Sequence, residues 1–173
     1  MVTGMQTVTA EHTVLSTRLG DLTIVRDDDH LIGLYFPHHW YRPDPVTFGR
    51  RSDQGFEDVS RQLAEYLAGP RTDFDLPTEA RGNRFQRRVW ELIAQIPYGH
   101  TTSYRDLARR LSSEATAQEV GAAVSRNPLC ILIPCHRVIG STGKLTGYAG
   151  GLKRKQGLLE LERATVLPGR SAN

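Results

Sequence analysis

The sequence predicts an α/β protein with a small N-terminal domain, a sheet plus one helix, and a mainly helical C-terminal domain that carries a helix-turn-helix. Short strand-like runs crowd the first 36 residues, whereas most later segments place apolar residues at helical spacing behind capping residues. The charges divide in the same way. Residues 1–81 hold 13 Asp and Glu against 8 Lys and Arg, and residues 82–173 hold 6 against 14. We therefore predict two domains, 1–81 and 82–173.

Composition and length restrict the class of protein. The 173 residues suffice for a buried core, and no apolar run approaches the 18 residues of a membrane span. We expect no membrane partner and no signal peptide, because the opening MVTGMQTVTAEHTV lacks a charged start before an apolar block. Cys130 and Cys135, the two cysteines, form a poor disulfide framework and a poor zinc site, which favours a reducing cytoplasm.

The N-terminal domain is expected to be a sheet followed by a helix. Two or three strands fall within residues 13–36, separated by the turns LGD and RDDDH. Residues 38–51 are rich in proline and polar residues, which indicates a loop. A helix over residues 56–69 ends at Gly69-Pro70, and the polar segment 70–82 is the predicted linker.

Three helices of the C-terminal domain start with capping pairs in which a polar residue precedes Gln, Asp or Glu by three positions. These pairs are Asn83 with Gln86, Ser103 with Asp106, and Thr116 with Glu119. The last two helices, joined by a turn and rich in arginine, fit a helix-turn-helix, although the pattern taken alone is more often that of a plain helical hairpin. Residues 152–163 predict a closing amphipathic helix.

A buried strand is predicted over residues 129–133, ending at Pro134, which cannot donate to a sheet. Cys130 fits an inert core position within it. Cys135 directly precedes His136, and a cysteine reacts as its thiolate. Adjacent side chains of a strand point in opposite directions, so His136 can act as base only through a tight turn or a bridging water. Taken alone, the dipeptide is more often structural than catalytic.

The hexapeptide IPCHRV, residues 133–138, resembles the active-site signature of the O6-alkylguanine-DNA alkyltransferases, also called methylated-DNA–protein-cysteine methyltransferases. The resemblance covers about residues 84–163, and residues 1–80 resemble the variable N-terminal domain of that family more weakly. The further matching segments are Phe85–Trp90, Ile96–Gly99, Ser103-Tyr104, Asn127-Pro128, Gly143, Gly147–Leu152 and Leu158–Glu162.

This resemblance implies DNA repair by irreversible, single-turnover transfer of the alkyl group from O6-alkylguanine, and also from O4-alkylthymine, to an internal cysteine. Cys135 is the implied nucleophile, and His136 the implied acceptor of its proton through a water. The implied supporting residues are Glu162, which orients His136; Asn127, which holds the turn; and Tyr104, which donates to the departing guanine. No metal or organic cofactor is implied, because a thiolate can displace an activated alkyl group directly.

The glycine-rich segment after Cys135 is implied to form the base pocket. An alkyl group on O6 is inaccessible inside a duplex, so the base must be flipped out, which costs a few kcal/mol. Residues without Cβ let a flat purine approach the backbone, although a flexible turn without a role is the alternative. The implied substrate-binding residues are Val138, Gly147, Tyr148, Ala149 and Gly150.

The implied partner is double-stranded DNA with an alkylated guanine. Relatives usually place an arginine in the second helix of the helix-turn-helix to fill the gap left by the flipped base, and this chain has Gln118 there. Either Gln118 or Arg126 could displace the base. The predicted DNA contacts are Ser103, Arg105, Thr116, Gln118, Arg126 and Arg137.

Other function classes are weighed against this one. A non-catalytic binder of alkylated DNA would lack the signature cysteine, which Cys135 supplies. A cysteine hydrolase or redox enzyme would need an oxyanion motif or a resolving cysteine, and neither is visible. Some relatives bind zinc through cysteine and histidine ligands in the N-terminal domain. Here that region has no cysteine, and His38-His39 alone form a weak site, so we expect no metal. We expect a monomer in solution and leave cooperative DNA binding open.

Overall fold

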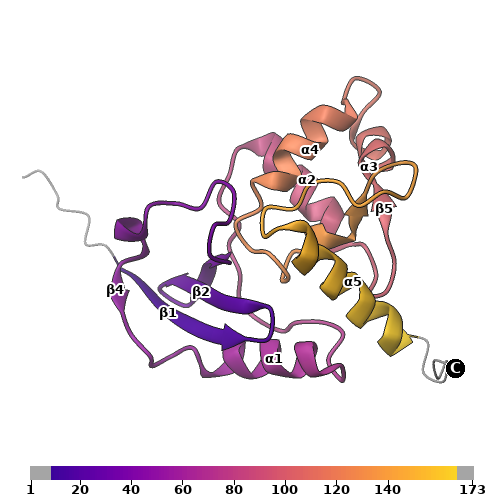
Figure 1. Ribbon diagram of the computed structural model, residues 1–173. Coiled ribbons are helices and arrows are strands. Elements are labelled where there is room, and N and C mark those ends of the chain that lie inside the picture. Colours follow the sequence, from indigo (N-terminus) through magenta and orange to yellow (C-terminus); the bar gives the residue numbers. More distant parts are fainter. Residues whose placement is uncertain (1–8, 167–173) are drawn as a thin grey trace, which may run out of the picture.

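The computed structural model describes residues 9–166 and has the predicted α/β architecture (Figure 1). The N-terminal unit is a four-stranded sheet in the order β3-β2-β1-β4, in which β4 is parallel to β1 and the other pairs are antiparallel. Its elements are β1 (Ala10–Thr17), β2 (Gly20–Asp27), β3 (His30–Tyr35), the 3-10 helix η1 (Pro45–Phe48), β4 (Arg50–Arg51) and α1 (Glu57–Ala68).

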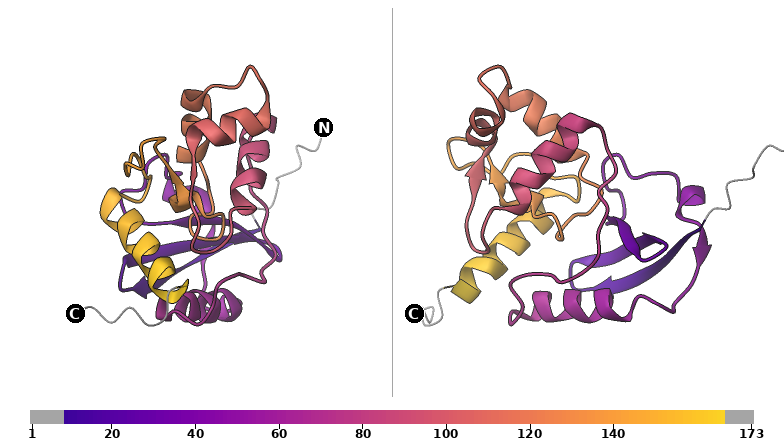
Figure 2. Two further views of the ribbon diagram at one scale, coloured as in Figure 1. Left: turned by 90° about the vertical axis from the view of Figure 1, so that its right-hand side faces the viewer. Right: turned by 180° about the vertical axis from the view of Figure 1, so that it is seen from behind.

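Both faces of β2 are covered, which explains why four successive residues of this strand, 22–25, are buried. Leu22 and Ile24 belong to the main core together with Leu63 of α1. Val25 belongs to a second, small cluster with Phe48 of η1. The two views of Figure 2 show α1 lying along one face of the sheet.

Within residues 84–166, the C-terminal unit contains five helical segments and a minimal sheet of β5 and β6, which pair in parallel. All three predicted capping residues are confirmed: Asn83 and Thr116 form capping boxes, and the Ser103 side chain accepts a hydrogen bond from the Asp106 amide. The elements are α2 (Arg84–Ala94), β5 (Thr102–Ser103), α3 (Tyr104–Leu111), α4 (Ala117–Ser125), η2 (Cys135–Arg137), β6 (Val138–Ile139) and α5 (Leu152–Val166).

The strand predicted over residues 129–133 is wrong. This buried segment makes only isolated bridges, and its chain reverses at Ile131, which has a φ of 71°. The apolar run reflects burial rather than an extended conformation, because a buried turn shows the same composition as a buried strand. The reversal matters because it delivers Cys135 to the interior.

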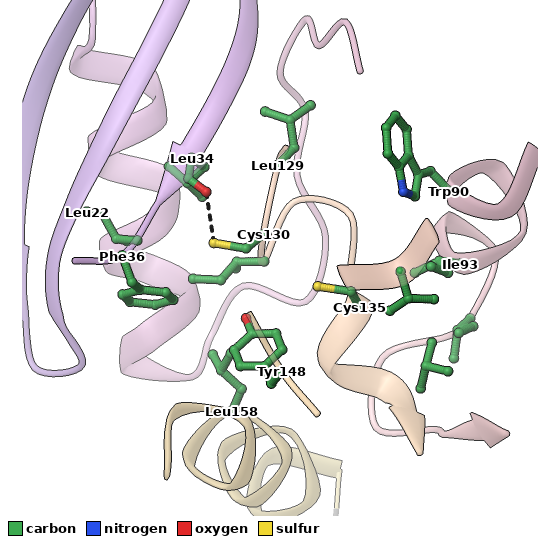
Figure 3. Close-up of a cluster of buried hydrophobic side chains, with 14 of the residues drawn as sticks. Leu22, Leu34, Phe36, Trp90, Ile93, Leu129, Cys130, Cys135, Tyr148 and Leu158 are labelled. Carbon is green, nitrogen blue, oxygen red and sulfur yellow. Dashed lines mark hydrogen bonds between the residues drawn. The ribbon is translucent and has the colours of Figure 1, made fainter. Parts of the chain in front are cut away.

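The two units share one hydrophobic core. Leu34 and Phe36 of the N-terminal unit belong to the same buried cluster as Leu129 and Leu158 of the C-terminal unit (Figure 3). The Leu34 amide also donates to the Pro128 carbonyl at 2.8 Å. The site described below is therefore held by both units. Across residues 9–166, each helix is too short or too polar to span a bilayer.

Candidate active site

Cys135 is the first residue of η2, a 3-10 helix of one turn, and the residue is only 4% exposed. Its amide donates to the Ile133 carbonyl at 2.7 Å, and the Arg137 amide closes the turn on Pro134. The turn removes the difficulty of an extended Cys-His pair, because successive side chains of a 3-10 turn do not point to opposite faces. Both cysteines are free, and Figure 3 shows them in the same buried cluster.

His136 lies against Glu162 of α5, with His136 Nε2 and Glu162 Oε2 2.8 Å apart and both side chains buried. A carboxylate acceptor favours the tautomer with the proton on Nε2, which leaves the Nδ1 lone pair free. His136 Nδ1 is buried and has no hydrogen-bond partner within the described part of the chain. Burial lowers the pKa of His136 despite the nearby carboxylate, so the ring is neutral and able to accept a proton.

Besides His136, three residues donate hydrogen bonds to Glu162. Arg137 donates from Nε at 2.7 Å and from Nη2 at 2.9 Å, the Tyr66 hydroxyl donates at 2.6 Å, and the Gly99 amide donates at 3.4 Å. Burial alone would raise the pKa of Glu162, but the hydrogen bonds from His136 and Arg137 outweigh it and hold the pKa at about 2. Glu162 is therefore a permanent carboxylate behind His136.

The placement of Arg137 corrects the prediction that it contacts DNA. Its side chain is buried, and its Nη1 donates to the Ile96 carbonyl at 2.7 Å in addition to the Glu162 pair. A buried guanidinium that is already paired has no surface to offer to a phosphate. No local pattern indicates this placement, because Glu162 lies 25 residues away.

Asn127 bridges the buried turn that precedes Cys135. Its Nδ2 donates to the Ile133 carbonyl at 2.9 Å, and its Oδ1 accepts from the Leu129 amide at 3.0 Å. These two bonds span the reversal at Ile131 and fix the approach to Cys135. Asn127 therefore lies where a residue that holds the turn before Cys135 is expected to lie.

The Cys135 thiol is not ionised at rest. Burial raises its pKa to about 11, although the Asn127 amide and the positive charge of Lys155 act in the opposite direction. Reaction at neutral pH therefore needs a base, and His136 is the adjacent candidate.

Lys155 of α5 is a residue that the sequence reasoning missed. Its buried ammonium donates to the carbonyls of Val138, Thr146 and Gly147 at 2.6, 3.0 and 3.1 Å, and burial lowers its pKa to about 8. It thereby ties the glycine-rich loop to the helix behind Cys135. The available signal was its position, since a lysine three residues before Leu158 lies on the apolar face of the helix.

A cavity of about 300 Å³ opens beside Cys135 and lies between the glycine-rich loop and α4. The predicted Tyr104, Gly147, Tyr148 and Ala149 line it. Its other lining residues are Trp40, Gly121, Ala122, Val124, Ser125 and Thr146. The Tyr104 hydroxyl donates to the Thr146 carbonyl at 3.0 Å, on the cavity wall.

Two predicted substrate residues lie elsewhere. Val138 is fully buried on β6 and contributes its carbonyl to Lys155 rather than a floor to the cavity. Gly150 faces another groove, and a Cβ there would meet the Phe36 ring at 2.7 Å. Its missing side chain serves core packing rather than the approach of a base.

Trp40 is the second site residue that the sequence reasoning missed. It belongs to the N-terminal loop after β3, and its amide donates to the Ala149 carbonyl at 3.0 Å. This bond attaches the loop to the cavity wall. An aromatic residue within a Pro-rich loop was the only available signal, and a loop tryptophan has many possible roles.

The two candidates for displacing a base lie at opposite ends of α4, about 12 Å apart at the helical rise per residue. Gln118 is exposed on the first turn and precedes the cavity-lining Gly121 and Ala122 by three and four positions, which places it on the same helix face. Arg126 caps the other end, and its guanidinium lies 4.0 Å from the ring centre of Tyr41. Arg105 and Thr116 are exposed and Ser103 is half-buried on the same helix pair.

Potential metal ligands are scattered over the described residues, where no three His, Cys, Asp or Glu side chains come together. His39, one of the two N-terminal candidates, is buried, and burial lowers its pKa to about 4.

Comparison with known proteins matches both units of the chain. Residues 84–164 match the 6-O-methylguanine DNA methyltransferase, DNA binding domain, and residues 11–80 match the 6-O-methylguanine DNA methyltransferase, ribonuclease-like domain. A methylated-DNA–protein-cysteine methyltransferase of Mycolicibacterium paratuberculosis is 43% identical over 153 residues, which are 88% of this chain and 92% of the relative. A similar protein from Mycobacterium bovis is 47% identical over 126 residues, 73% of this chain and 71% of the relative.

Solved structures agree with these matches. The crystal structure of Mycobacterium tuberculosis OGT in complex with DNA superposes with a TM-score of 0.84 and 39% identity, covering 90% of this chain and 94% of the other. That of the Mycobacterium tuberculosis O6-methylguanine methyltransferase gives 0.83 and 38%, covering 92% and 96%.

Proposed function

The chain belongs to the 6-O-methylguanine DNA methyltransferase family, and from this premise we propose that it transfers the alkyl group of O6-alkylguanine in duplex DNA to Cys135, once and irreversibly. Its enzyme class is methylated-DNA–protein-cysteine methyltransferase, and its role is repair of alkylated DNA. O4-alkylthymine is the second proposed substrate, because it also carries its alkyl group on an exocyclic oxygen.

The observation that carries the proposal is a buried series of three residues beside a cavity, which we call the catalytic row. Cys135 lines the cavity, His136 follows it in η2, and Glu162 pairs with His136. In the proposed reaction His136 takes the thiol proton on Nδ1 through a water, and Glu162 stabilises the resulting imidazolium. The thiolate attacks the alkyl carbon, so that a carbon–sulfur bond forms while the carbon–O6 bond breaks.

The electron pair of the broken bond passes to the guanine, which regains a proton and leaves as the normal base. Tyr104, on the cavity wall, is the proposed hydrogen-bond donor to the departing base, a role in which its hydroxyl turns from the Thr146 carbonyl to the base. The thiol proton ends on the guanine, so the reaction balances without a cofactor. The thioether product has no proton to lose and cannot form a thiolate again, which limits each chain to one turnover.

We propose that the duplex lies along α3 and α4, and the similarity of the chain to a solved relative in complex with DNA supports DNA as the partner. Gln118 then reaches the gap left by the flipped base, because it shares a helix face with the cavity. Ser103, Arg105 and Thr116 are the proposed phosphate contacts. Arg126 plays no part in base displacement in this proposal, because Tyr41 holds it at the other end of α4. Affinity should fall steeply with salt.

Intact mass measurement after incubation with O6-benzylguanine tests the reaction. The expected result is one benzyl group per chain, mapped to Cys135 by peptide analysis, with no further gain at higher substrate. Modification at Cys130, or product beyond one equivalent, would contradict the proposal. Binding of O6-methylguanine duplex with an unchanged mass would instead support the non-catalytic binder.

A further inference from the structure

We infer that Tyr66, on α1 of the N-terminal unit, is a positioning residue of the catalytic row: its hydroxyl holds Glu162 and thereby sets the basicity of His136. The inference rests on the proposed function of Cys135 and His136. It extends the reactive network into a part of the chain that carries none of the signature residues.

Tyr66 contacts the same carboxylate oxygen of Glu162 that faces His136. Its hydroxyl donates to Glu162 Oε2 at 2.6 Å, and the same oxygen faces His136 Nε2 at 2.8 Å. The hydroxyl itself lies 3.5 Å from His136 Nε2. Among the described residues that hydrogen-bond to Glu162, Tyr66 is the one from the N-terminal unit.

The environment keeps the hydroxyl protonated and the ring fixed. Burial and the Glu162 charge raise the pKa of Tyr66, so it acts as a donor throughout the physiological range. The side chain is fully buried, and its ring packs at 5.2 Å on Phe74 and edge-on at 6.0 Å to Tyr98. Phenylalanine would preserve that packing, so the hydroxyl is a separable feature of this position.

The sign of the effect follows from the charges around His136. Glu162 and Lys155 face it from α5, Cys135 and Arg137 from η2, and Tyr66 from α1. A hydrogen bond from Tyr66 draws electron density on Glu162 Oε2 away from the imidazole. Without this bond the carboxylate interacts more strongly with a protonated His136, and the pKa of His136 rises. Only neutral His136 can accept the thiol proton.

The test is Tyr66→Phe, assayed by the single-turnover rate of alkyl transfer from an O6-methylguanine duplex between pH 5 and pH 9. We expect the plateau rate to fall on the order of tenfold, because Glu162 loses the hydrogen bond that fixes its position against His136. We expect the acid limb of the profile to move to higher pH by about half a unit to one unit. Tyr35→Phe is the matched control, another buried tyrosine of the sheet unit that makes no bond to the catalytic row.

Two further measurements separate positioning from folding. Thermal melting of both variants reports any loss of stability, and the double variant Tyr66→Phe/Glu162→Gln reports coupling. If Tyr66 acts through the carboxylate charge, its change should have little further effect once Glu162 is glutamine. A rate that falls equally at every pH, or the same loss in both backgrounds, would overturn the inference.

The outcomes also distinguish this inference from the proposed function. A wild-type chain that transfers no alkyl group to Cys135 would contradict the proposed function itself. A wild-type chain that does so, together with a Tyr66→Phe variant of unchanged rate and unchanged pH midpoint, would overturn only the role of Tyr66.

Discussion

Cys130 and Cys135 lie five residues apart in one buried cluster, and they differ in almost everything else (Figure 3). The Cys130 sulfur donates to the Leu34 carbonyl at 3.0 Å, and burial raises its pKa well above the usual value. The Cys135 sulfur borders a cavity, with Asn127, Lys155 and His136 around it. Burial is common to both, so the neighbours decide which thiol reacts.

The largest expected effect comes from replacing the sulfur of each cysteine by oxygen. Cys135→Ser should abolish alkyl transfer, because a hydroxyl next to neutral histidine is far less ionised than a thiol. Cys130→Ser should transfer normally, because serine can keep the donor to Leu34 and lies away from the cavity. Single-turnover assays with benzylguanine measure both variants, and a Cys130→Ser chain that fails to react while remaining folded would contradict the division.

The next effect comes from the carboxylate behind His136, which has no counterpart beside Cys130. Glu162→Gln should slow transfer on the order of 100-fold, the lower range of what a positioned base contributes. DNA affinity should stay near that of the wild type, because the carboxylate is buried. A parallel loss of DNA affinity, measured by titration with a fluorescent duplex, would show that the change acts on the fold instead.

Glu162 also predicts how stability depends on acid. Its pKa is about 2 in the folded chain against 4.5 for the free group, so its ionisation stabilises the fold above about pH 4.5. That contribution should disappear as the pH falls from 4.5 towards 2. Melting temperatures across this range should therefore fall less steeply in Glu162→Gln than in the wild type.

A smaller effect comes from changing the wall of the cavity beside Cys135. Trp40→Ala removes one wall of the cavity, and because Trp40 is half exposed we expect the rate with free benzylguanine to fall about threefold to tenfold. Val46→Ala is the control, since Val46 is an exposed apolar residue of the same unit outside the cavity. Equal rates for all three chains would mean that Trp40 borders the cavity without contacting the substrate.

The smallest effect concerns access to Cys135 from a duplex. Gln118→Arg should speed repair of O6-methylguanine in duplex DNA, because an added charge-assisted contact lowers the free-energy barrier by about 1 kcal/mol. The free base needs no flipping, so its rate should hardly change. Single-turnover rates on both substrates measure the difference, and an equal gain on both would place the effect in the pocket rather than in base flipping.

Local patterns predicted much of this molecule. Asn83 and Thr116 identified the starts of their helices correctly, because an N-cap bonds an amide three residues away. The IPCHRV hexapeptide identified the family, which the comparisons confirm. Where local patterns misled, a distant partner was the cause: Arg137 pairs with Glu162, and Gly150 packs on Phe36.

The sequence by itself determined the α/β class, the helix starts and the choice of Cys135 as the candidate nucleophile, because each depends on residues close together in the chain. Only the tertiary structure decided what surrounds that thiol. Tyr66 meets Glu162 across 96 residues, Trp40 reaches the cavity from a loop of the other unit, and the chain reverses where its apolar run predicted a strand. The hydrophobic effect buries an apolar segment without determining its backbone conformation. Contacts between residues far apart in the chain therefore depend on how the folded elements pack.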